Sequence, residues 1–279
     1  MTQGQIPRWN LALLALIFAI PALVGMASAQ TTQPDPFANT NGICGTERAD
    51  MVACDAIRRR AIVDPLTPPY SVVGRLNFAS TDIRSHCTGV LVSDHLALTA
   101  AHCLWNSPRM RWIPNTSLRF VTGYQHGRAN AVAHVTDVIT APALNRTANF
   151  AIAPPMDWAL LVLDTPLGAN GNHVALFSGK LRLAGPGHAV LVGYAGLTSH
   201  VLSRADDCGR PLTAAGRLMA HCSAMPGDSG APLFWLGADG LELLGIATAI
   251  HAASGQITTD FAPWFRLREA IAGEIAKGH

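Results

Sequence analysis

The sequence predicts an all-β fold that ends in one α-helix, and two observations lead to this prediction. From Tyr70 onward, the chain consists of short apolar runs rich in Val, Leu, Ile and aromatic residues. Gly, Pro, Asn and Asp separate these runs, and the chain contains 25 glycines and 18 prolines, which suits many short strands joined by turns. This pattern is typical of a β-barrel or a β-sandwich.

The apolar runs themselves are the predicted strands. They occupy residues 71–78, 87–93, 95–101, 118–124, 158–164, 188–195, 231–236 and 241–250. The segment after Pro263 has a different pattern, because apolar residues recur at helical spacing with charged residues between them. We expect an amphipathic C-terminal helix whose apolar face consists of Trp264, Leu267, Ile271 and Ile275.

The composition limits the function classes. Of the 279 residues, 49% are hydrophobic and 14% are charged, which excludes a disordered or coiled-coil protein. The net charge of +2 is too small to indicate binding to nucleic acid or to an anionic membrane. We expect no cofactor and a monomeric protein.

The N-terminus predicts export. Arg8 precedes an apolar run at 11–24, and Ala, Ser and Ala at 27–29 fit a small-residue cleavage site. The alternative is a membrane anchor, but Pro21 breaks the run, which falls short of the ~20 residues needed to span a bilayer. We therefore predict a signal peptide at 1–29 and a secreted protein, either periplasmic or extracellular, with no membrane contact after the signal is removed.

The residues after the signal peptide form a predicted leader or propeptide at 30–60. Its first part, up to residue 43, is polar and rich in Pro, Thr and Asn, which is typical of a flexible segment. The second part, 44–60, predicts a short helical piece that ends in three arginines. The body of the protein is predicted at 61–279.

Six cysteines in an oxidising compartment favour disulfides. Neighbours in the sequence form three candidate pairs. These are Cys44 with Cys54, Cys87 with Cys103, and Cys208 with Cys222. No cysteine or histidine group has the spacing of zinc ligands, so we expect no metal site.

Three motifs carry candidate chemistry. His102 closes an apolar strand and is followed at once by a cysteine, Asp157 opens another apolar strand, and Ser229 lies between Asp228 and Gly230 in a tight turn. Each has an ordinary structural explanation when taken alone: a structural histidine, a strand-end cap and a β-turn. Their order along the chain, His then Asp then Ser, makes coincidence a poor explanation.

With these motifs, the chain resembles the chymotrypsin/trypsin-like serine protease superfamily, especially its bacterial secreted members, some of which are related to glutamyl endopeptidases. The matching stretches are CTGVLVSDHLALTAAHC, DWALLVL, PGDSGAPLF and the following strand LLGIATAI. The α/β-hydrolase alternative requires Gly two residues after the serine, where this chain has Ala231. The resemblance covers roughly residues 61–275.

The resemblance implies two six-stranded antiparallel β-barrels, at about 61–165 and 166–262, followed by the C-terminal helix. It also implies that His102, Asp157 and Ser229 form a catalytic triad for peptide hydrolysis through an acyl-enzyme. The backbone N–H groups of Gly227 and Ser229 would form the oxyanion hole. Substrates would be proteins or peptides.

Asp228 leaves two possibilities for activation. In family members with Asp beside the nucleophile, that carboxylate commonly pairs with a new N-terminal ammonium after zymogen cleavage. Cleavage by an activating protease between Arg60 and Ala61 would supply such an end at the right distance from His102. Alternatively, Asp228 pairs with an arginine and residues 30–60 stay attached, as in some bacterial relatives.

The specificity pocket departs from the pattern of the family. Ser223 stands where trypsin has Asp, and Met225 stands where trypsin has Cys. Ala247 follows Gly-Ile where glutamyl endopeptidases have His. The candidate pocket residues are Ser223, Ala247, Thr248, Ala249 and Ile250, which indicate an uncharged side chain before the cleaved bond.

Two other functions remain open at this point. A catalytically silent binding module on the same fold would usually lack a triad residue, and a secreted esterase would share the nucleophile chemistry. The remaining histidines are interpreted as surface or core residues with no shared role.

Overall fold

The computed structural model describes Met1, Cys44 and residues 51–79, 84–177, 187–237, 240–253 and 256–279. The predicted signal peptide after Met1 and the first part of the leader lie outside the described residues. The described residues from Cys44 onward belong to one compact unit. No helix in the described ranges is long and apolar enough to cross a membrane.

Six antiparallel strands close into a barrel in the first half of this unit. In pairing order they are β2 (Val73–Ala79), β3 (Arg84–Leu91), β4 (Leu96–Thr99), β9 (Ala159–Leu163), β8 (Ala131–Thr140) and β7 (Leu118–Thr122). Strands β4 and β9 are buried at every position, which explains why their sequences are continuous apolar runs without alternation. His102 lies in the segment directly after β4, and Asp157 lies in the segment directly before β9.

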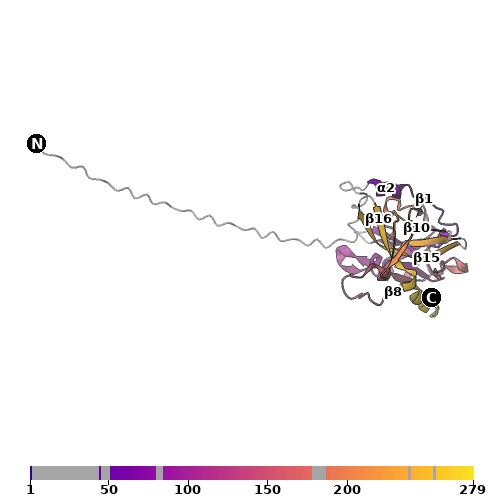
Figure 1. Ribbon diagram of the computed structural model, residues 1–279. Helices are drawn as coiled ribbons and strands as arrows, with labels where there is room; N and C mark the ends of the chain where they lie inside the picture. The colour runs from indigo at the N-terminus through magenta and orange to yellow at the C-terminus, as the bar shows by residue number, and fades with distance from the viewer. Residues whose placement is uncertain (2–43, 45–50, 80–83, 178–186, 238–239, 254–255) are drawn as a thin grey trace. The chain divides into compact units, whose positions relative to one another are not determined.

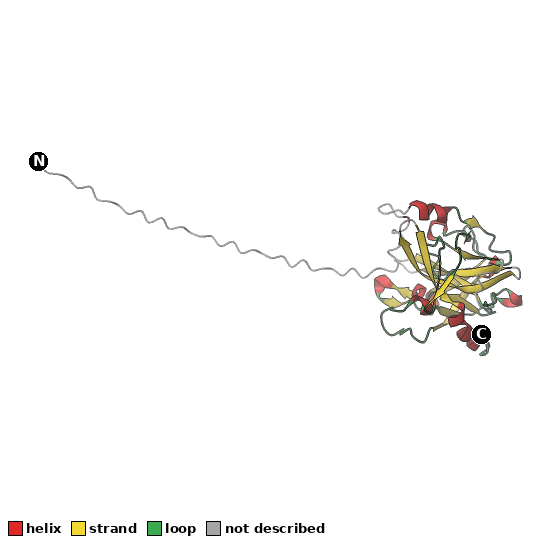
Figure 2. Cartoon of the chain, in the orientation of Figure 1, coloured by secondary structure: helices red, strands yellow, loops and turns green. Residues whose placement is uncertain are grey.

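The second half contains a larger sheet of eight antiparallel strands. In pairing order they are β1 (Ala61–Ile62), β11 (Ser203–Ala205), β10 (His188–Gly193), β14 (Pro232–Gly237), β15 (Gly240–Ala253), β16 (Gln256–Pro263), β13 (Arg217–Ala220) and β12 (Leu212–Ala214). Figure 2 shows strands as the dominant elements of the described residues. The predicted all-β class with a C-terminal helix is confirmed.

Several details differ from the expectation. The predicted apolar runs do not include the strands β8, β11, β12, β13 and β16. The second sheet has eight strands and not six, because the short strands β11 and β1 extend one edge. The segment at 61–62 was expected in the first barrel, but its strand pairs with β11 through Ala61 with Arg204 and Ile62 with Ser203. A strand of two residues has no periodicity, so its partner was not readable from the sequence.

Two α-helices flank the strands. Helix α2 (Met51–Arg58) falls in the predicted helical piece of the leader, and helix α3 (Trp264–Ile275) is the predicted C-terminal helix. Trp264, Leu267 and Ile271 are buried as expected. Ile275, the last residue of the helix, is 46% exposed, contrary to expectation.

Short 3-10 helices and one small sheet occupy the connections. The small sheet pairs β5 (Trp105–Asn106) with β6 (Arg111–Trp112). The 3-10 helices are η1 (Tyr70–Val72), η2 (Ala101–Leu104), η3 (Ser107–Arg109), η4 (Asn115–Ser117), η5 (Pro154–Met156), η6 (Ala169–Gly171) and η7 (Gly196–Thr198).

A shared core joins the barrel to the second sheet. One apolar cluster contains Leu98 and Leu160 of the barrel together with Val192 and Phe234 of the second sheet. A second cluster fills the interior of the second sheet around Phe261. The two halves are therefore packed on each other through buried side chains, and the candidate site lies where they meet.

The structure contains the three disulfides expected from the neighbouring cysteines. They join Cys44 to Cys54, Cys87 to Cys103, and Cys208 to Cys222. Each links segments that are close in the sequence, so each stabilises a local loop.

Candidate active site

Thr88 on β3 ties the barrel to the loop that carries Ser229. Its backbone N–H donates to the carbonyl oxygen of Ser229 at 2.9 Å. Its hydroxyl donates to the carbonyl oxygen of Gly227 at 2.8 Å and accepts from the N–H of Tyr194 at 3.0 Å. Because Thr88 is fully buried, these bonds fix the loop against the barrel without competition from water.

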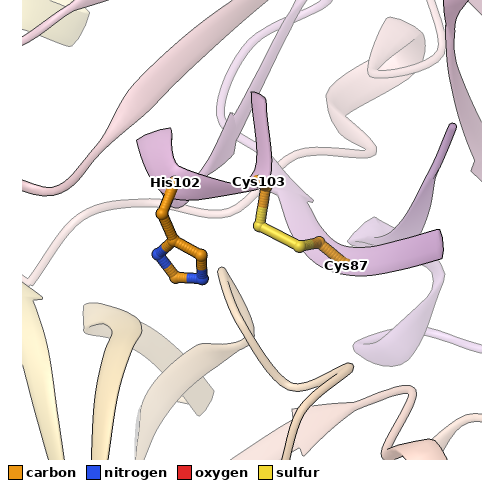
Figure 3. A group of neighbouring side chains, drawn as sticks. All are labelled: Cys87, His102 and Cys103. Atoms are coloured by element: carbon orange, nitrogen blue, oxygen red, sulfur yellow. A yellow bond between two sulfur atoms is a disulfide. The ribbon is translucent and has the colours of Figure 1, made fainter. Parts of the chain in front are cut away.

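His102 lies in η2, directly after β4. The N–H of Cys103 donates to the carbonyl oxygen of Ala100, which closes the short helical turn. The Cys87–Cys103 disulfide joins this turn to β3 and lies beside the imidazole (Figure 3). His102 and these two sulfurs are close enough to suggest a metal site, but each sulfur is bonded to the other and offers no thiolate.

Asp157 holds His102 at two points. One carboxylate oxygen lies 2.7 Å from Nδ1 of the ring, and the other accepts the backbone N–H of His102 at 2.9 Å. With Nδ1 as the donor to the carboxylate, Nε2 carries the free lone pair that a general base needs. The N–H of Asp157 donates to Pro154 of η5, so this short turn sets where the carboxylate points.

Two opposing effects act on the pKa of His102. Burial lowers this pKa, whereas the negative charge of Asp157 and its hydrogen bond raise it. The carboxylate outweighs burial, so the pKa of His102 is raised above its usual value. The imidazolium is therefore stabilised by Asp157, as a base that must accept a proton requires.

An aromatic pair extends from one side of the imidazole, and no sequence motif marked these residues. Phe150 meets the His102 ring edge-on at 6.4 Å between centroids, and Trp112 packs on Phe150 at 5.9 Å. The guanidinium of Arg146 lies 5.2 Å from the centroid of Trp112. These residues come from the long connections on either side of β7 and β8, where no periodic pattern marks them.

Ser229 lies on a turn that packs against the segment before His102. Its carbonyl oxygen lies 3.9 Å from Sγ of Cys103, the residue after His102. A Cβ atom on Gly230, whose φ is +78°, would come within 2.2 Å of the Thr88 carbonyl oxygen and 2.3 Å of Oγ1 of Thr99. Only glycine allows this approach, so Gly230 brings the serine loop onto the strand end that carries the histidine.

The serine hydroxyl itself is not engaged. The hydrogen bonds of the described residues do not include one between Oγ of Ser229 and the ring of His102. Catalytic hydrogen bonds in free enzymes are often long and shorten only when substrate binds.

The turn before Ser229 has a conformation suited to anion binding. Residues 225–228 form a type II turn: Pro226 occupies its second position, Gly227 follows at φ +101°, and the Asp228 N–H donates to the Met225 carbonyl oxygen at 2.9 Å. The carbonyl oxygen of Pro226 accepts from the N–H of Gly196 at 2.8 Å.

The orientation of this peptide decides where the Gly227 N–H points. In a trans peptide, the N–H lies opposite the carbonyl group, so the Gly227 N–H points away from Gly196. Among the described backbone hydrogen bonds, neither the Gly227 N–H nor the Ser229 N–H has an acceptor. These two unpaired donors, one in the turn and one directly after it, form a candidate site for a developing oxyanion.

Asp228 is fully buried and contacts the arginine that the sequence marked as a candidate cleavage site. Nη1 of Arg60 lies 3.0 Å from one carboxylate oxygen of Asp228 and 2.8 Å from the other. The second carboxylate oxygen also accepts the N–H of Met225 at 3.0 Å. Of the two possibilities for Asp228, the structure therefore contains the pairing with an arginine, and that arginine is Arg60.

His86 is a neighbour of this turn that the sequence interpretation left without a role. Its Nε2 lies 2.9 Å from the Tyr194 carbonyl oxygen and 2.8 Å from where a Cβ atom on Gly227 would stand. Burial, with a further contribution from the charge of Arg75, lowers the pKa of His86 to about 4. The ring is thus neutral at ordinary pH and can donate to the Tyr194 carbonyl.

Four of the five candidate pocket residues lie on β15. Ala247, fully enclosed, accepts from the Gly230 N–H at 2.7 Å, and the hydroxyl of Thr248 donates to the Asp260 carbonyl oxygen at 3.2 Å. Ala249 follows an irregularity in the pairing of β15 with β16. Ile250 is half-buried.

The remaining pocket residue, Ser223, has a partner that the sequence did not reveal. Its N–H donates to one carboxylate oxygen of Asp207 at 3.1 Å, and its hydroxyl donates to the other. Ser223 is buried and Asp207 is exposed. The two residues are distant in the sequence, and no motif around Asp207 indicates the contact.

Comparisons with known proteins add the following findings. The family model described as Trypsin matches residues 67–266. The structure of a Glu endopeptidase in complex with MPD shares 19% identity at a TM-score of 0.57, covering 76% of this chain and 96% of that chain. The protease Anisep from Arthrobacter nicotinovorans shares 17% identity at a TM-score of 0.54, covering 72% and 95%. No curated protein matches the chain.

Proposed function

The chain belongs to the trypsin family of serine-type endopeptidases, and we propose that it is a secreted enzyme that uses His102, Asp157 and Ser229 as its catalytic triad. The observation that supports the triad most is the 2.7 Å contact between Nδ1 of His102 and the Asp157 carboxylate. This contact leaves Nε2 free to act as the base. The backbone N–H groups of Gly227 and Ser229 have no backbone acceptor among the described residues, which supports their use as oxyanion donors.

The first half of the reaction forms an acyl-enzyme. Nε2 of His102 takes the proton from Oγ of Ser229, and Oγ attacks the carbonyl carbon of the peptide bond. The carbonyl oxygen becomes an oxyanion. His102 then gives its proton to the leaving nitrogen, the C–N bond breaks, and the amine product departs.

The second half releases the acid product. A water molecule gives a proton to Nε2 of His102 and attacks the ester carbon of the acyl-enzyme. The C–O bond to Ser229 then breaks, and the proton returns from His102 to Oγ. Asp157 keeps its charge throughout and stabilises the imidazolium formed in each half.

The N–H groups of Gly227 and Ser229 would hold the oxyanion in both halves. Each such donor contributes on the order of 3 kcal/mol to the transition state in enzymes of this chemistry. The type II turn supports this role because it presents the Gly227 N–H before substrate arrives. Little reorganisation is then required at the moment of reaction.

Export and substrate class follow from the chain itself. The N-terminal apolar segment and three disulfides support a protein that leaves the cytoplasm, and its substrates would be proteins or peptides. The pocket residues Ser223, Ala247, Thr248 and Ala249 carry no charge, which supports cleavage after an uncharged side chain. Both oxygens of Asp207 are engaged with Ser223, so its carboxylate positions the base of the pocket.

The test of the function is hydrolysis of casein by the purified protein and by Ser229→Ala. We expect proteolysis by the parent enzyme and a drop in kcat of roughly a million-fold in the variant. Casein left intact by the parent enzyme would indicate a silent binding module. Rapid cleavage of simple esters with no cleavage of matched peptides would indicate an esterase.

The pocket is tested by profiling cleavage on a peptide library with the parent enzyme and with Asp207→Asn. We expect cleavage after uncharged residues in both, at a lower rate in the variant because Ser223 loses its fixed partner. A preference for Lys or Arg that disappears in Asp207→Asn would contradict this account.

A further inference from the structure

We infer that Arg60 is a positioning residue of the uncleaved enzyme. It holds Asp228, and through Asp228 it holds the turn of residues 225–228, here called the oxyanion turn. The chain is therefore active without a cut between Arg60 and Ala61. This inference rests on the proposed function, because it concerns the regulation of the same site. The observations that carry it are the burial of the pair, the packing of the segment before Arg60, and the shape of the turn.

The ion pair is closed off from water. The side chain of Arg60 is 2% exposed and that of Asp228 is 0% exposed. Burial raises the pKa of the Asp228 carboxyl group, and the Arg60 charge opposes that shift. Asp228 is the only charged side chain within hydrogen-bond distance of Arg60 in the described part of the chain. The Arg60 charge therefore favours the ionised form of Asp228 in the interior.

A single nitrogen makes this contact. Nη1 of Arg60 bonds both oxygens of Asp228, whereas Nε and Nη2 have no hydrogen-bond partner among the described residues. Arginine usually binds a carboxylate with two nitrogens in parallel. Here the guanidinium contacts the carboxylate as a compact ammonium would, which is the group that a newly formed N-terminus would supply.

The segment before Arg60 is part of the folded body. Helix α2 lies against β16 (Figure 1), and its buried Cys54 and Ile57 pack in one cluster with Met225 and Ile257. Met225 is the first residue of the oxyanion turn. The helix therefore supports from one side the same turn that Arg60 holds through Asp228.

The segment after Arg60 is anchored as well. Strand β1 pairs with β11 at the edge of the second sheet, so the chain is fixed on both sides of the candidate cut. An activating protease of trypsin type would need the Arg60 side chain in its own pocket. That side chain is buried, and exposing it would require breaking the pair with Asp228.

The position of the Cys44–Cys54 disulfide also argues against activation by cleavage. Cys44 and Cys54 both precede Arg60, so their bond does not link the segment to the body. A cut after Arg60 would leave Arg60 and α2 held by noncovalent contacts alone. Cleavage would weaken the support of Asp228 by Arg60, which is the reverse of activation.

The turn already has the form that catalysis needs. The Asp228 N–H donates to the Met225 carbonyl oxygen, and the Met225 N–H donates to the Asp228 carboxylate. These two bonds close the turn, and Gly227 lies at φ +101° with no backbone acceptor for its N–H among the described residues. This geometry exists with residues 51–60 attached. No later rearrangement of Asp228 is required to form it.

The test combines labelling with a pH profile. A fluorophosphonate probe reacts with the secreted protein, and intact mass identifies the labelled species. We expect the label on a species that still contains residues 51–60. A labelled species that begins at Ala61, with the longer species unlabelled, would overturn the inference.

Substitutions at Arg60 separate positioning from cleavage. Arg60→Gln should lose about 10²–10³-fold in kcat with a smaller change in KM, because the turn supplies its N–H in the transition state. Arg60→Lys should keep activity within about tenfold of the parent enzyme at pH 7. Its activity should fall as the lysine deprotonates near pH 10. The parent enzyme should not show this alkaline loss, because its guanidinium stays protonated. Arg59→Gln is the matched control, since Arg59 is exposed, and should leave both properties unchanged.

A cleaved enzyme would behave differently. The positive partner of Asp228 would be the α-amine of Ala61, so the parent enzyme and Arg60→Lys would lose activity at the same alkaline pH. That result would overturn the inference. An unchanged kcat in Arg60→Gln would overturn it as well. Failure of the proposed function is distinguishable, because the parent protein would then take up no label at all.

Discussion

The two oxygens of Asp157 hold one histidine through its ring and through its backbone. The ring contact fixes the tautomer and the backbone contact fixes the position of η2, so one carboxylate sets both requirements of the base. Its charge also keeps the pKa of His102 above the usual value despite burial. This shift determines how the enzyme responds to pH.

We predict that kcat/KM falls on acidification through a pH above 6.5, the usual pKa of histidine. A raised pKa means that the protonated, inactive imidazolium persists to higher pH. Asp157→Asn should move this limb to lower pH and reduce kcat by roughly 10⁴-fold, as in the Ser-His-Asp precedent. A pH–rate profile of both proteins measures the shift, and an identical limb in the two would contradict the assigned partner.

His86 acts on stability in acid. Its folded-state pKa of about 4 lies below the unfolded value of 6.5, so the unfolded state binds the proton first as pH falls. The stabilisation from the neutral ring is complete above pH 6.5 and is lost progressively down to pH 4, by up to about 3 kcal/mol.

His86→Gln should reduce this acid sensitivity, because glutamine can still donate to the Tyr194 carbonyl but does not titrate. Urea unfolding at pH 4 and pH 7 measures the difference, with the exposed His173→Gln as control. Equal loss of unfolding free energy in His86→Gln and the parent protein would exclude this histidine as the cause.

At the residue scale, the sequence was enough to propose His102, Asp157 and Ser229 as a triad, because the order of motifs can be read along one chain. It could not indicate Phe150 beside His102 or Asp207 beside Ser223, since these contacts join segments with no shared pattern. The sequence singled out both Arg60 and Asp228, yet it left two alternatives: cleavage after Arg60, or pairing of Asp228 with an arginine. Burial of the pair was needed to favour one.

At the scale of the element, the position of the serine turn depends on close contact between backbones more than on secondary-structure propensity. The serine turn can meet β3 and β4 only because residue 230 has no side chain. Gly171 has a similar φ of +75°, but a Cβ atom there would meet nothing within 4 Å. Alanine substitutions at these two glycines therefore separate the free-energy cost of a positive φ from that of a steric clash.

Gly171→Ala should lower the free energy of unfolding by about 1 kcal/mol, the cost of a left-handed conformation for a residue with a side chain. Gly230→Ala should cost several-fold more and abolish activity, because the Thr88 carbonyl lies 2.2 Å from the added carbon. Denaturant unfolding and casein hydrolysis of the two variants provide the comparison. Similar stability losses in both would show that the serine turn can move away from β3.

Elements with a strong period were predictable from the sequence. The C-terminal helix was expected from its apolar spacing and is α3, although Ile275 escapes burial at its end. The two-residue strands β1, β5 and β6 were not predicted. Their existence depends on a partner strand, and a short sequence does not specify a partner.

At the scale of the whole molecule, the two halves are joined by a shared apolar core and by a few buried polar bonds. The barrel supplies His102 and Asp157, and the chain of the second half supplies Ser229. Thr88 is the joint, since it bonds Ser229, Gly227 and Tyr194 from the barrel side. The fold class followed from composition and strand pattern, but this joint did not, because its partners are far apart in the sequence.

Thr88→Val should cost about 2–3 kcal/mol of stability, because the buried Gly227 carbonyl and Tyr194 N–H lose their partner while the side-chain volume is kept. We also expect a lower kcat, because the Gly227 carbonyl loses the hydrogen bond that holds this residue in place. The exposed Thr116→Val serves as control in thermal unfolding and peptide hydrolysis. Unchanged stability in Thr88→Val would mean that the two halves are held by the apolar core alone.

The most direct test of the central claim is to map the site of covalent attachment of a fluorophosphonate by tandem mass spectrometry. We expect attachment to Ser229, weaker labelling as pH falls and His102 becomes protonated, and no labelling of His102→Ala. Attachment at another residue, or undiminished labelling without His102, would contradict the central claim.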